Sequence, residues 1–209
     1  MTDEILGIFK AISEEVVPQA ETLRDLDAKI GDGDLGITIT RGMEAVMAGL
    51  DDLAGTPVSN QLGRSGMAFN RAAASTFGVL FATAMMRGGA AVKDRDDVGA
   101  ADVVAIGRAA VQGMMDRGKA KIGDKTLLDA LSPAIDAFEE AQSAGKSLKE
   151  STDAAVAACE AGTKATIEMQ SKVSRAGWLG ERSIGHQDPG ATAVMFMLQA
   201  VQNWVNENT

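Results

Sequence analysis

The stretch Asp27-Ala-Lys-Ile-Gly-Asp32-Gly-Asp34-Leu-Gly36 organises the rest of the chain, because three carboxylates fall within eight residues and glycines interrupt them. Two carboxylates about 4 Å apart repel by roughly 4 kcal/mol at an effective dielectric constant near 20. Asp27 is expected to close a helix, whereas Asp32 and Asp34 flank a glycine in an extended turn, so all three side chains can reach one point. The pattern predicts a bound divalent cation; the alternative is an Asp/Gly turn exposed to water.

The ligand types narrow the choice of ion. Aspartate oxygens suit Mg2+ or Ca2+ rather than Zn2+, because no cysteine lies nearby and His186 is the only histidine. A Ca2+-binding EF-hand is excluded, because counting from Asp32 places Ile37 where the loop requires glycine and Met43 where it requires glutamate. Mg2+ usually keeps waters and takes phosphate oxygens as its remaining ligands. The cluster therefore predicts a metal that also holds a phosphate.

The composition indicates a globular protein and excludes several partners. The chain has 209 residues, 45% of them hydrophobic, which is enough for one substantial core or two small ones. A formal charge of -9 argues against nucleic acid or an anionic membrane surface as a partner. Cys159 is the only cysteine, the N-terminus lacks the pattern of a signal peptide, and no apolar run is long enough to span a membrane. We therefore expect a cytoplasmic protein.

Helical periodicity dominates the chain and predicts an all-helical single domain over residues 1–209. Apolar residues recur at three- and four-residue steps, and no sustained alternating run or hairpin signal interrupts them. Pro18 is expected to end or kink the first helix. Ser147 and Glu150 form a capping box before a helix that runs to about 169, and Asp188 with Pro189 marks the start of the last helix. Other helices are predicted over about 59–71 and over 76–87. A further helix is predicted to end near Gly118, and the next is predicted to run from about Leu127 to Gly145.

Two further loops are candidates for binding an anion. Residues 118–126 nearly match a Walker loop, but Asp124 separates the second glycine from the lysine and a helix precedes the loop, so a P-loop is rejected. What remains is a cationic turn before a helix N-terminus, which favours anions, or simply a capped helix start. The second loop comprises Ser174-Arg175, Arg182 and the turn 185–190, and it again leads into a helix. Its Arg175 can clamp a phosphate bidentately. His186 in that loop is either a packing residue or a catalyst.

Three segments together resemble the nucleotide-binding L subunits of bacterial dihydroxyacetone kinases, which are free-standing versions of that family's kinase domain. They are 26–34, 118–126 and, most specifically, Arg175-Ala-Gly-Trp-Leu-Gly-Glu-Arg-Ser-Ile-Gly-His-Gln-Asp-Pro-Gly190. The resemblance covers nearly the whole chain. It implies an up-and-down barrel of eight helices that holds ADP or ATP at one end. The nucleotide is expected to be held through two Mg2+ ions, as in the family.

The resemblance also implies roles for individual residues. Asp27, Asp32 and Asp34 fall on the metal-ligand positions, and Arg175 is the implied catalytic cation. The implied nucleotide-contact positions are Leu35, Gly36, Ile37, Thr38, Ala74, Ser75, Gly118, Leu127, Arg175, Asp188, Pro189 and Gly190. Two departures affect these contacts. Leu35 stands where the family commonly has histidine, and Ala74-Ser-Thr-Phe-Gly78 replaces a glycine-rich loop.

The implied reaction is transfer of a phosphoryl group to dihydroxyacetone or a related small ketose. In the family a separate substrate-binding subunit holds the ketone through a histidine, and this chain has no second histidine for that task. We therefore expect a substrate-binding partner subunit. The phosphoryl donor is either ATP or a phosphocarrier protein that recharges bound ADP. The alternatives are a nucleotide-loaded regulatory subunit without turnover of its own and a plain helical Mg2+-binding scaffold.

Overall fold

The computed structural model describes residues 2–93, 95 and 98–209, and this part of the chain is helical without any strand. Nine long α-helices and the four-residue helix α9 make up the described fold. Their bounds are α1 Thr2–Val16, α2 Ala20–Ile30, α3 Leu35–Ala48, α4 Val58–Ala72, α5 Thr76–Ala91, α6 Ala100–Gly118, α7 Leu128–Ser143, α8 Leu148–Ala165, α9 Ser174–Gly177 and α10 Pro189–Asn208. The predicted all-α fold is confirmed.

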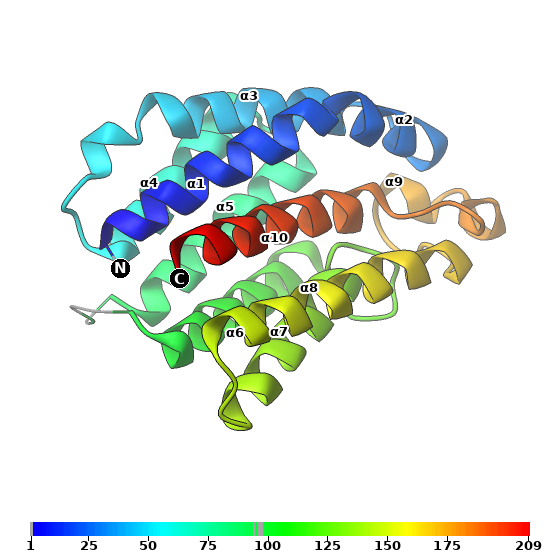
Figure 1. Ribbon diagram of the computed structural model, residues 1–209. Coiled ribbons are helices and arrows are strands. Elements are labelled where there is room, and N and C mark those ends of the chain that lie inside the picture. Colours follow the sequence, from blue (N-terminus) through cyan, green and yellow to red (C-terminus); the bar gives the residue numbers. More distant parts are fainter. Residues whose placement is uncertain (1, 94, 96–97) are drawn as a thin grey trace.

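The long helices form a closed ring in which each packs on the next along the chain (Figure 1). The ring closes because α10 packs on both α8 and α1. Helices α1 and α2 are separated only by the 3-10 turn Val17–Gln19, which contains Pro18. When α1 and α2 are counted as one kinked helix, the barrel formed by the described residues consists of eight helices. The expected kink at Pro18 and the expected eight-helix barrel are therefore both observed.

Side-chain caps begin two of these helices where the sequence predicts them. Ser147 and Glu150 form the capping box of α8, and the Asp188 carboxylate accepts a hydrogen bond from the backbone N–H of Ala191 at 2.7 Å. Pro189 is the first residue of α10, where its missing N–H costs nothing. Two helix ends differ from the prediction: α8 stops at Ala165 and tightens into a 3-10 turn instead of running to 169, and α5 continues to Ala91 instead of ending near 87.

The interior of the ring is filled by apolar side chains. The largest cluster includes Leu23, Ile39, Met43 and Phe69, all fully buried. A Cβ at Gly42 would lie only 2.3 Å from the Phe69 ring, so α3 and α4 can approach closely only with glycine there. None of the helices in the described residues is long and apolar enough to cross a membrane.

The two ends of the barrel differ in what they carry. Figure 1 places both termini at one end and the α2–α3 turn, α9 and the start of α10 at the other. The second end therefore gathers the aspartate turn and the 174–190 segment, which are far apart in sequence.

Candidate functional site

The three aspartates of the α2–α3 turn converge on one point. Asp27, Asp32 and Asp34 each offer a carboxylate oxygen, and these oxygens lie within 4.8 Å of one another. Two ligands of one Mg2+ lie at most about 4.2 Å apart, so small side-chain rotations suffice to bring all three onto one ion. The hard-oxygen donor set also fits Mg2+. The residues present can therefore hold the predicted metal.

Two glycines and the start of α3 shape this turn. A Cβ at Gly31 would lie 2.1 Å from Asp27 Oδ1, and Gly33 adopts a φ of +73° that favours glycine. Asp27 Oδ2 accepts hydrogen bonds from the backbone N–H groups of Asp34 (2.9 Å) and Leu35 (3.2 Å). A carboxylate at a helix N-terminus is stabilised by these free donors and by the helix dipole. Asp27 is thus oriented by the fold itself.

The charges around the triad are only partly balanced. Partial burial, and then the negative charge of Asp27, raise the pKa of the Asp34 carboxyl. Arg175 forms an ion pair with Asp32 and supplies a counter-charge from the 174–190 segment. Both partners of this pair are solvent-exposed. The triad therefore combines mutual repulsion with one exposed cation, which is an arrangement that favours binding of a further cation.

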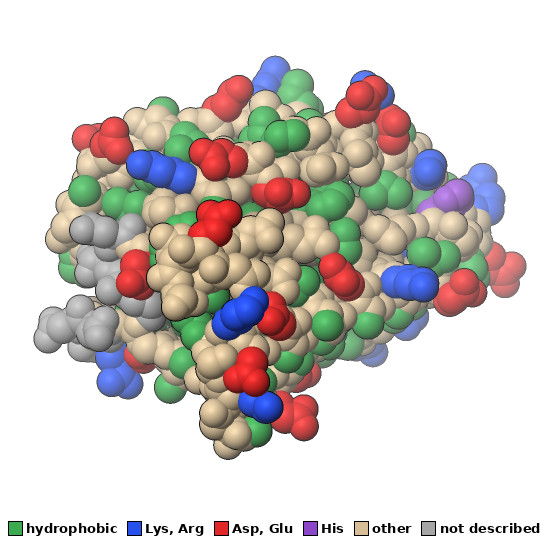
Figure 2. All heavy atoms as spheres, in the orientation of Figure 1, with side chains coloured by type: hydrophobic (Ala, Val, Ile, Leu, Met, Phe, Trp, Pro, Cys, Tyr) green, Lys and Arg blue, Asp and Glu red, His purple; other side chains and the backbone are tan. Residues whose placement is uncertain are grey.

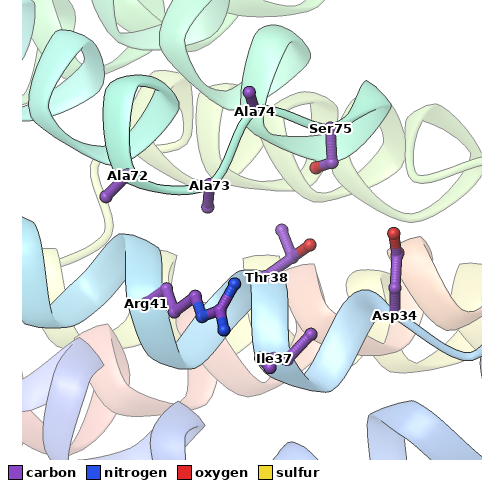
Figure 3. A pocket seen from close by; sticks show the side chains of 8 residues that line it. All are labelled: Asp34, Ile37, Thr38, Arg41, Ala72, Ala73, Ala74 and Ser75. Carbon is purple, nitrogen blue, oxygen red and sulfur yellow. The ribbon is translucent and has the colours of Figure 1, made fainter.

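A pocket of about 150 Å³ lies beside the triad, between α3 and the α4–α5 connection (Figure 3). Thr38 and Arg41 extend into it from α3 and Asp34 from the residue just before α3, and Ser75 faces them from the opposite wall. Ser75 caps α5, accepting a hydrogen bond from the backbone N–H of Gly78 at 3.0 Å. The pocket offers carboxylate, hydroxyl and guanidinium groups in one small space. The remaining lining residues are Ile37, Ala72, Ala73 and Ala74.

A second group of charges lies buried behind the triad. Burial raises the pKa of Asp188 to about 7, against the hydrogen bond from Ala191 and the charge of Lys125, while Asp129 and Asp27 raise it further. Burial also lowers the pKa of Lys125, and Asp188 opposes that shift. The charges of Lys125, Asp129 and Asp27 all affect the pKa of Asp188, so the start of α10 lies near both the aspartate turn and the 118–127 loop.

Residues 169–185, called here the Arg175 loop, carry α9 and join α8 to the start of α10. The loop is tied to residues 118–127 by the backbone N–H of Lys172, which donates to the Asp124 carbonyl at 3.1 Å. The Lys172 side chain also donates to the Gly123 carbonyl at 2.7 Å. Figure 2 shows Lys and Arg side chains at the end of the molecule where Figure 1 places α9. Basic groups thus lie at the same end of the molecule as the acidic triad.

Comparison with known proteins identifies the family. The family described as the DAK2 domain matches residues 29–203. The Escherichia coli protein named PEP-dependent dihydroxyacetone kinase, ADP-binding subunit DhaL, is 36% identical over 181 residues, which are 87% of this chain and 86% of that protein. The chain belongs to the DAK2-domain family. The resemblance to the L subunits of dihydroxyacetone kinases is confirmed.

Other relatives contain this DAK2 domain as part of a longer chain. The D-erythrulose kinase of Mycolicibacterium smegmatis is 31% identical, with 96% of this chain matching 35% of that protein. The crystal structure of the dihydroxyacetone kinase from C. freundii in complex with AMP-PNP and Mg2+ has a TM-score of 0.75 and 23% identity. That match covers 97% of this chain and 34% of the other. It confirms the fold.

The DAK2 domain brings together most, but not all, of the residues predicted to contact nucleotide. Ile37, Thr38, Ala74 and Ser75 line the pocket. In a second group, a Cβ at Gly190 would lie 3.2 Å from Asp188 Oδ2 and 3.5 Å from Leu127 Cβ, which places these three residues together. Pro189 is buried beside them at the start of α10.

Four of the predicted positions lie outside these two groups, and one of them is Arg175, which pairs with Asp32. The Leu35 side chain is buried in the main core, and a Cβ at Gly36 would lie 2.0 Å from the Ala20 carbonyl, so both residues serve helix packing. Gly118 ends α6 and faces Leu80 of α5. At Leu35 and Gly36, only the backbone N–H and C=O groups are left to contact a ligand.

Sequence reasoning missed three charged residues at this end. Arg41 reaches the pocket because it follows Thr38 by three residues on α3, a spacing that places both on one helix face. Asp129 is buried and accepts hydrogen bonds from the backbone N–H groups of Gly123 and Thr126, the latter at 2.7 Å. Lys125, read as part of a cationic anion-binding turn, is instead only 2% exposed. No local pattern marks a lysine for burial.

Proposed function

We propose that this chain binds Mg2+ and an adenine nucleotide at the triad end of the barrel. The observation that supports this most strongly is the convergence of Asp27, Asp32 and Asp34 beside a polar pocket. The names of the relatives are consistent with it: one is an ADP-binding subunit, and a solved relative holds AMP-PNP and Mg2+. The three aspartates would hold the metal, a second ion remaining a prediction. The metal would neutralise phosphate charge.

We further propose that the bound nucleotide's phosphoryl group is transferred to dihydroxyacetone or a related small ketose. The dihydroxyacetone kinase and erythrulose kinase names of the relatives support this substrate class. Phosphoryl transfer depends mainly on positioning and on offsetting charge that spreads over the transferred group. Arg175 suits the second task, because a guanidinium paired with one carboxylate keeps further N–H donors for phosphate oxygens.

The ketose, in this proposal, is held by a separate substrate-binding subunit that docks on the triad end. A small ketone has too few atoms to orient itself in an open site, and the pocket of about 150 Å³ is taken up by the phosphate end of the nucleotide. Closure by a partner would also exclude water from the reacting phosphate. The residues 1–209 would then act as one nucleotide-binding domain.

The test combines the purified chain with the substrate-binding subunit of a dihydroxyacetone kinase. Dihydroxyacetone and erythrulose are offered as acceptors, and ATP and a phosphorylated phosphocarrier protein as donors. We expect saturable phosphorylation only when both proteins are present. Turnover by this chain alone would contradict the division of labour. Tight Mg-nucleotide binding without turnover under any of these conditions would favour a regulatory subunit instead.

A further inference from the structure

Lys125 is a buried cation whose side chain holds both ends of the Arg175 loop. Its Nζ donates hydrogen bonds to the carbonyl of Met169, at 3.1 Å, and to the carbonyl of Ser183. These two carbonyls lie 14 residues apart in sequence and bracket Arg175. The ammonium group therefore sits at the neck of the loop, where the chain enters and leaves it.

Two backbone N–H groups also donate hydrogen bonds across the same neck. The N–H of Ser171 donates to Ser183 Oγ at 2.9 Å, and the N–H of Gly185 donates to the carbonyl of Ile167 at 2.8 Å. Beyond the neck the loop is more open: Arg175 is exposed, and Trp178 is 85% exposed. The position of Arg175 thus depends on how firmly the neck is held.

The burial of Lys125 requires an explanation, because a buried ammonium group loses its hydration. Burial lowers the pKa of Lys125, and the nearby Asp188 carboxylate offsets part of this effect. Lys125 also adopts a φ of +62°, a conformation that is uncommon for residues other than glycine. An apolar residue here would avoid the desolvation cost, and a glycine would avoid the backbone cost, so the ammonium group is expected to serve a purpose.

We propose that Lys125 is a positioning residue that fixes Arg175 relative to the aspartate triad by clamping the neck of the Arg175 loop. Its backbone belongs to the 118–127 loop, its ammonium group binds the Arg175 loop, and its charge faces Asp188 at the start of α10. It therefore connects three segments that meet at the site. The consequence for catalysis rests on the proposed role of Arg175 in phosphoryl transfer.

The structural part of this proposal is tested by hydrogen exchange, which does not require activity. In Lys125→Met, a variant of similar side-chain length, amides in residues 170–184 are expected to exchange about tenfold faster than in the parent chain. Leu50→Ala is the control, because Leu50 is buried in the core just beyond the far end of α3 and its truncation lowers global stability without touching the loop. Unchanged exchange in Lys125→Met, or equal acceleration in Leu50→Ala, would overturn the proposal.

The catalytic part is tested by a double-mutant cycle in the two-protein kinase assay. Lys125→Met is expected to lower kcat about tenfold while the KM for nucleotide changes less than about threefold. If Lys125 acts through Arg175, the double variant Lys125→Met/Arg175→Ala is no slower than Arg175→Ala alone. Multiplying effects would show that Lys125 acts independently. Absence of phosphoryl transfer by the parent chain would refute the proposed function, and the exchange result would still decide whether Lys125 holds the loop.

Discussion

Two sets of three aspartates lie at the same end of the barrel and differ in what satisfies them. The outer set, Asp27, Asp32 and Asp34, has carboxylates that face one another and are at least partly accessible to solvent. The inner set consists of Asp124, Asp129 and Asp188, which are 5%, 5% and 8% exposed. Each inner carboxylate accepts a hydrogen bond from a nearby backbone N–H group, whereas in the outer set Asp27 accepts such bonds and Asp32 pairs with the exposed Arg175. The difference indicates that the inner set serves the fold and the outer set serves a ligand.

The largest effect on stability is expected from the inner set. Asp129→Ala leaves the partly buried N–H groups of Gly123 and Thr126 without their acceptor, which should cost about 3 kcal/mol of unfolding free energy. Urea denaturation with linear extrapolation measures it. The matched outer variant, Asp34→Ala, relieves repulsion from Asp27 and should change stability by less than about 0.5 kcal/mol. Equal losses in the two variants would remove the distinction between the sets.

The second-largest effect is expected from the outer set and concerns stabilisation by bound nucleotide. At 100 times Kd, Mg-ADP should stabilise the parent chain by about 2.7 kcal/mol, and Asp34→Ala or Asp32→Ala should abolish that gain because a metal ligand is lost. Thermal denaturation with and without Mg-ADP measures the difference, and far-ultraviolet circular dichroism checks that the helices persist. A parent-like thermal shift in both variants would exclude the outer set as the cation site.

The third prediction concerns pH and Asp188. Because the pKa of Asp188 is raised to about 7 in the folded chain, the folded state binds its proton more tightly than the unfolded state does. This contribution to stability is fully present below the unfolded pKa and is lost as pH rises through about 7. Asp188→Asn keeps a good N-cap without the titration. Between about pH 5 and pH 7 it should gain stability relative to the parent by about 1 kcal/mol per pH unit.

The measurement is urea denaturation of both proteins across that pH range in EDTA, which keeps metal binding out of the comparison. A stability difference that does not vary with pH would mean that the Asp188 carboxyl titrates normally in the folded chain.

The fourth prediction concerns Arg175, which links the outer set to the Arg175 loop. Arg175→Ala should lower kcat of the two-protein kinase about tenfold, or 1.4 kcal/mol, because its charge acts mainly on the transferring phosphate. Nucleotide affinity should fall less than about threefold. Initial rates and isothermal titration separate the two quantities. Equal losses in rate and affinity would mean that Arg175 simply binds nucleotide.

How far the sequence predicts this end of the molecule depends on the range of the interactions. The outer set could be predicted, because its carboxylates and glycines lie within one turn. Asp188 could be predicted as a helix cap, because Pro189 follows it directly. The burial of Lys125 could not, because its acceptors lie 44 and 58 residues away in sequence. Similarly, Leu35 occupies a position predicted to contact nucleotide, but packing of α3 turns its side chain into the core.

The smallest expected effect separates two lysines that join the same loops. Lys172 donates to the carbonyl of Gly123 and lies 3.7 Å from Asp124 Oδ1, but its side chain is 58% exposed, whereas that of Lys125 is buried. Water can replace the contacts of an exposed ammonium group, so Lys172→Met should cost about 0.5 kcal/mol or less. This cost should shrink further at about 0.5 M salt, where screening is strong.

Lys125→Met instead leaves the carbonyls of Met169 and Ser183 without their donor in a site that water cannot readily enter, so its larger cost should persist at high salt. Urea denaturation at low and high salt measures both variants. A salt-independent loss in Lys172→Met as large as that in Lys125→Met would show that the exposed contact, and not the buried one, holds the Arg175 loop in place.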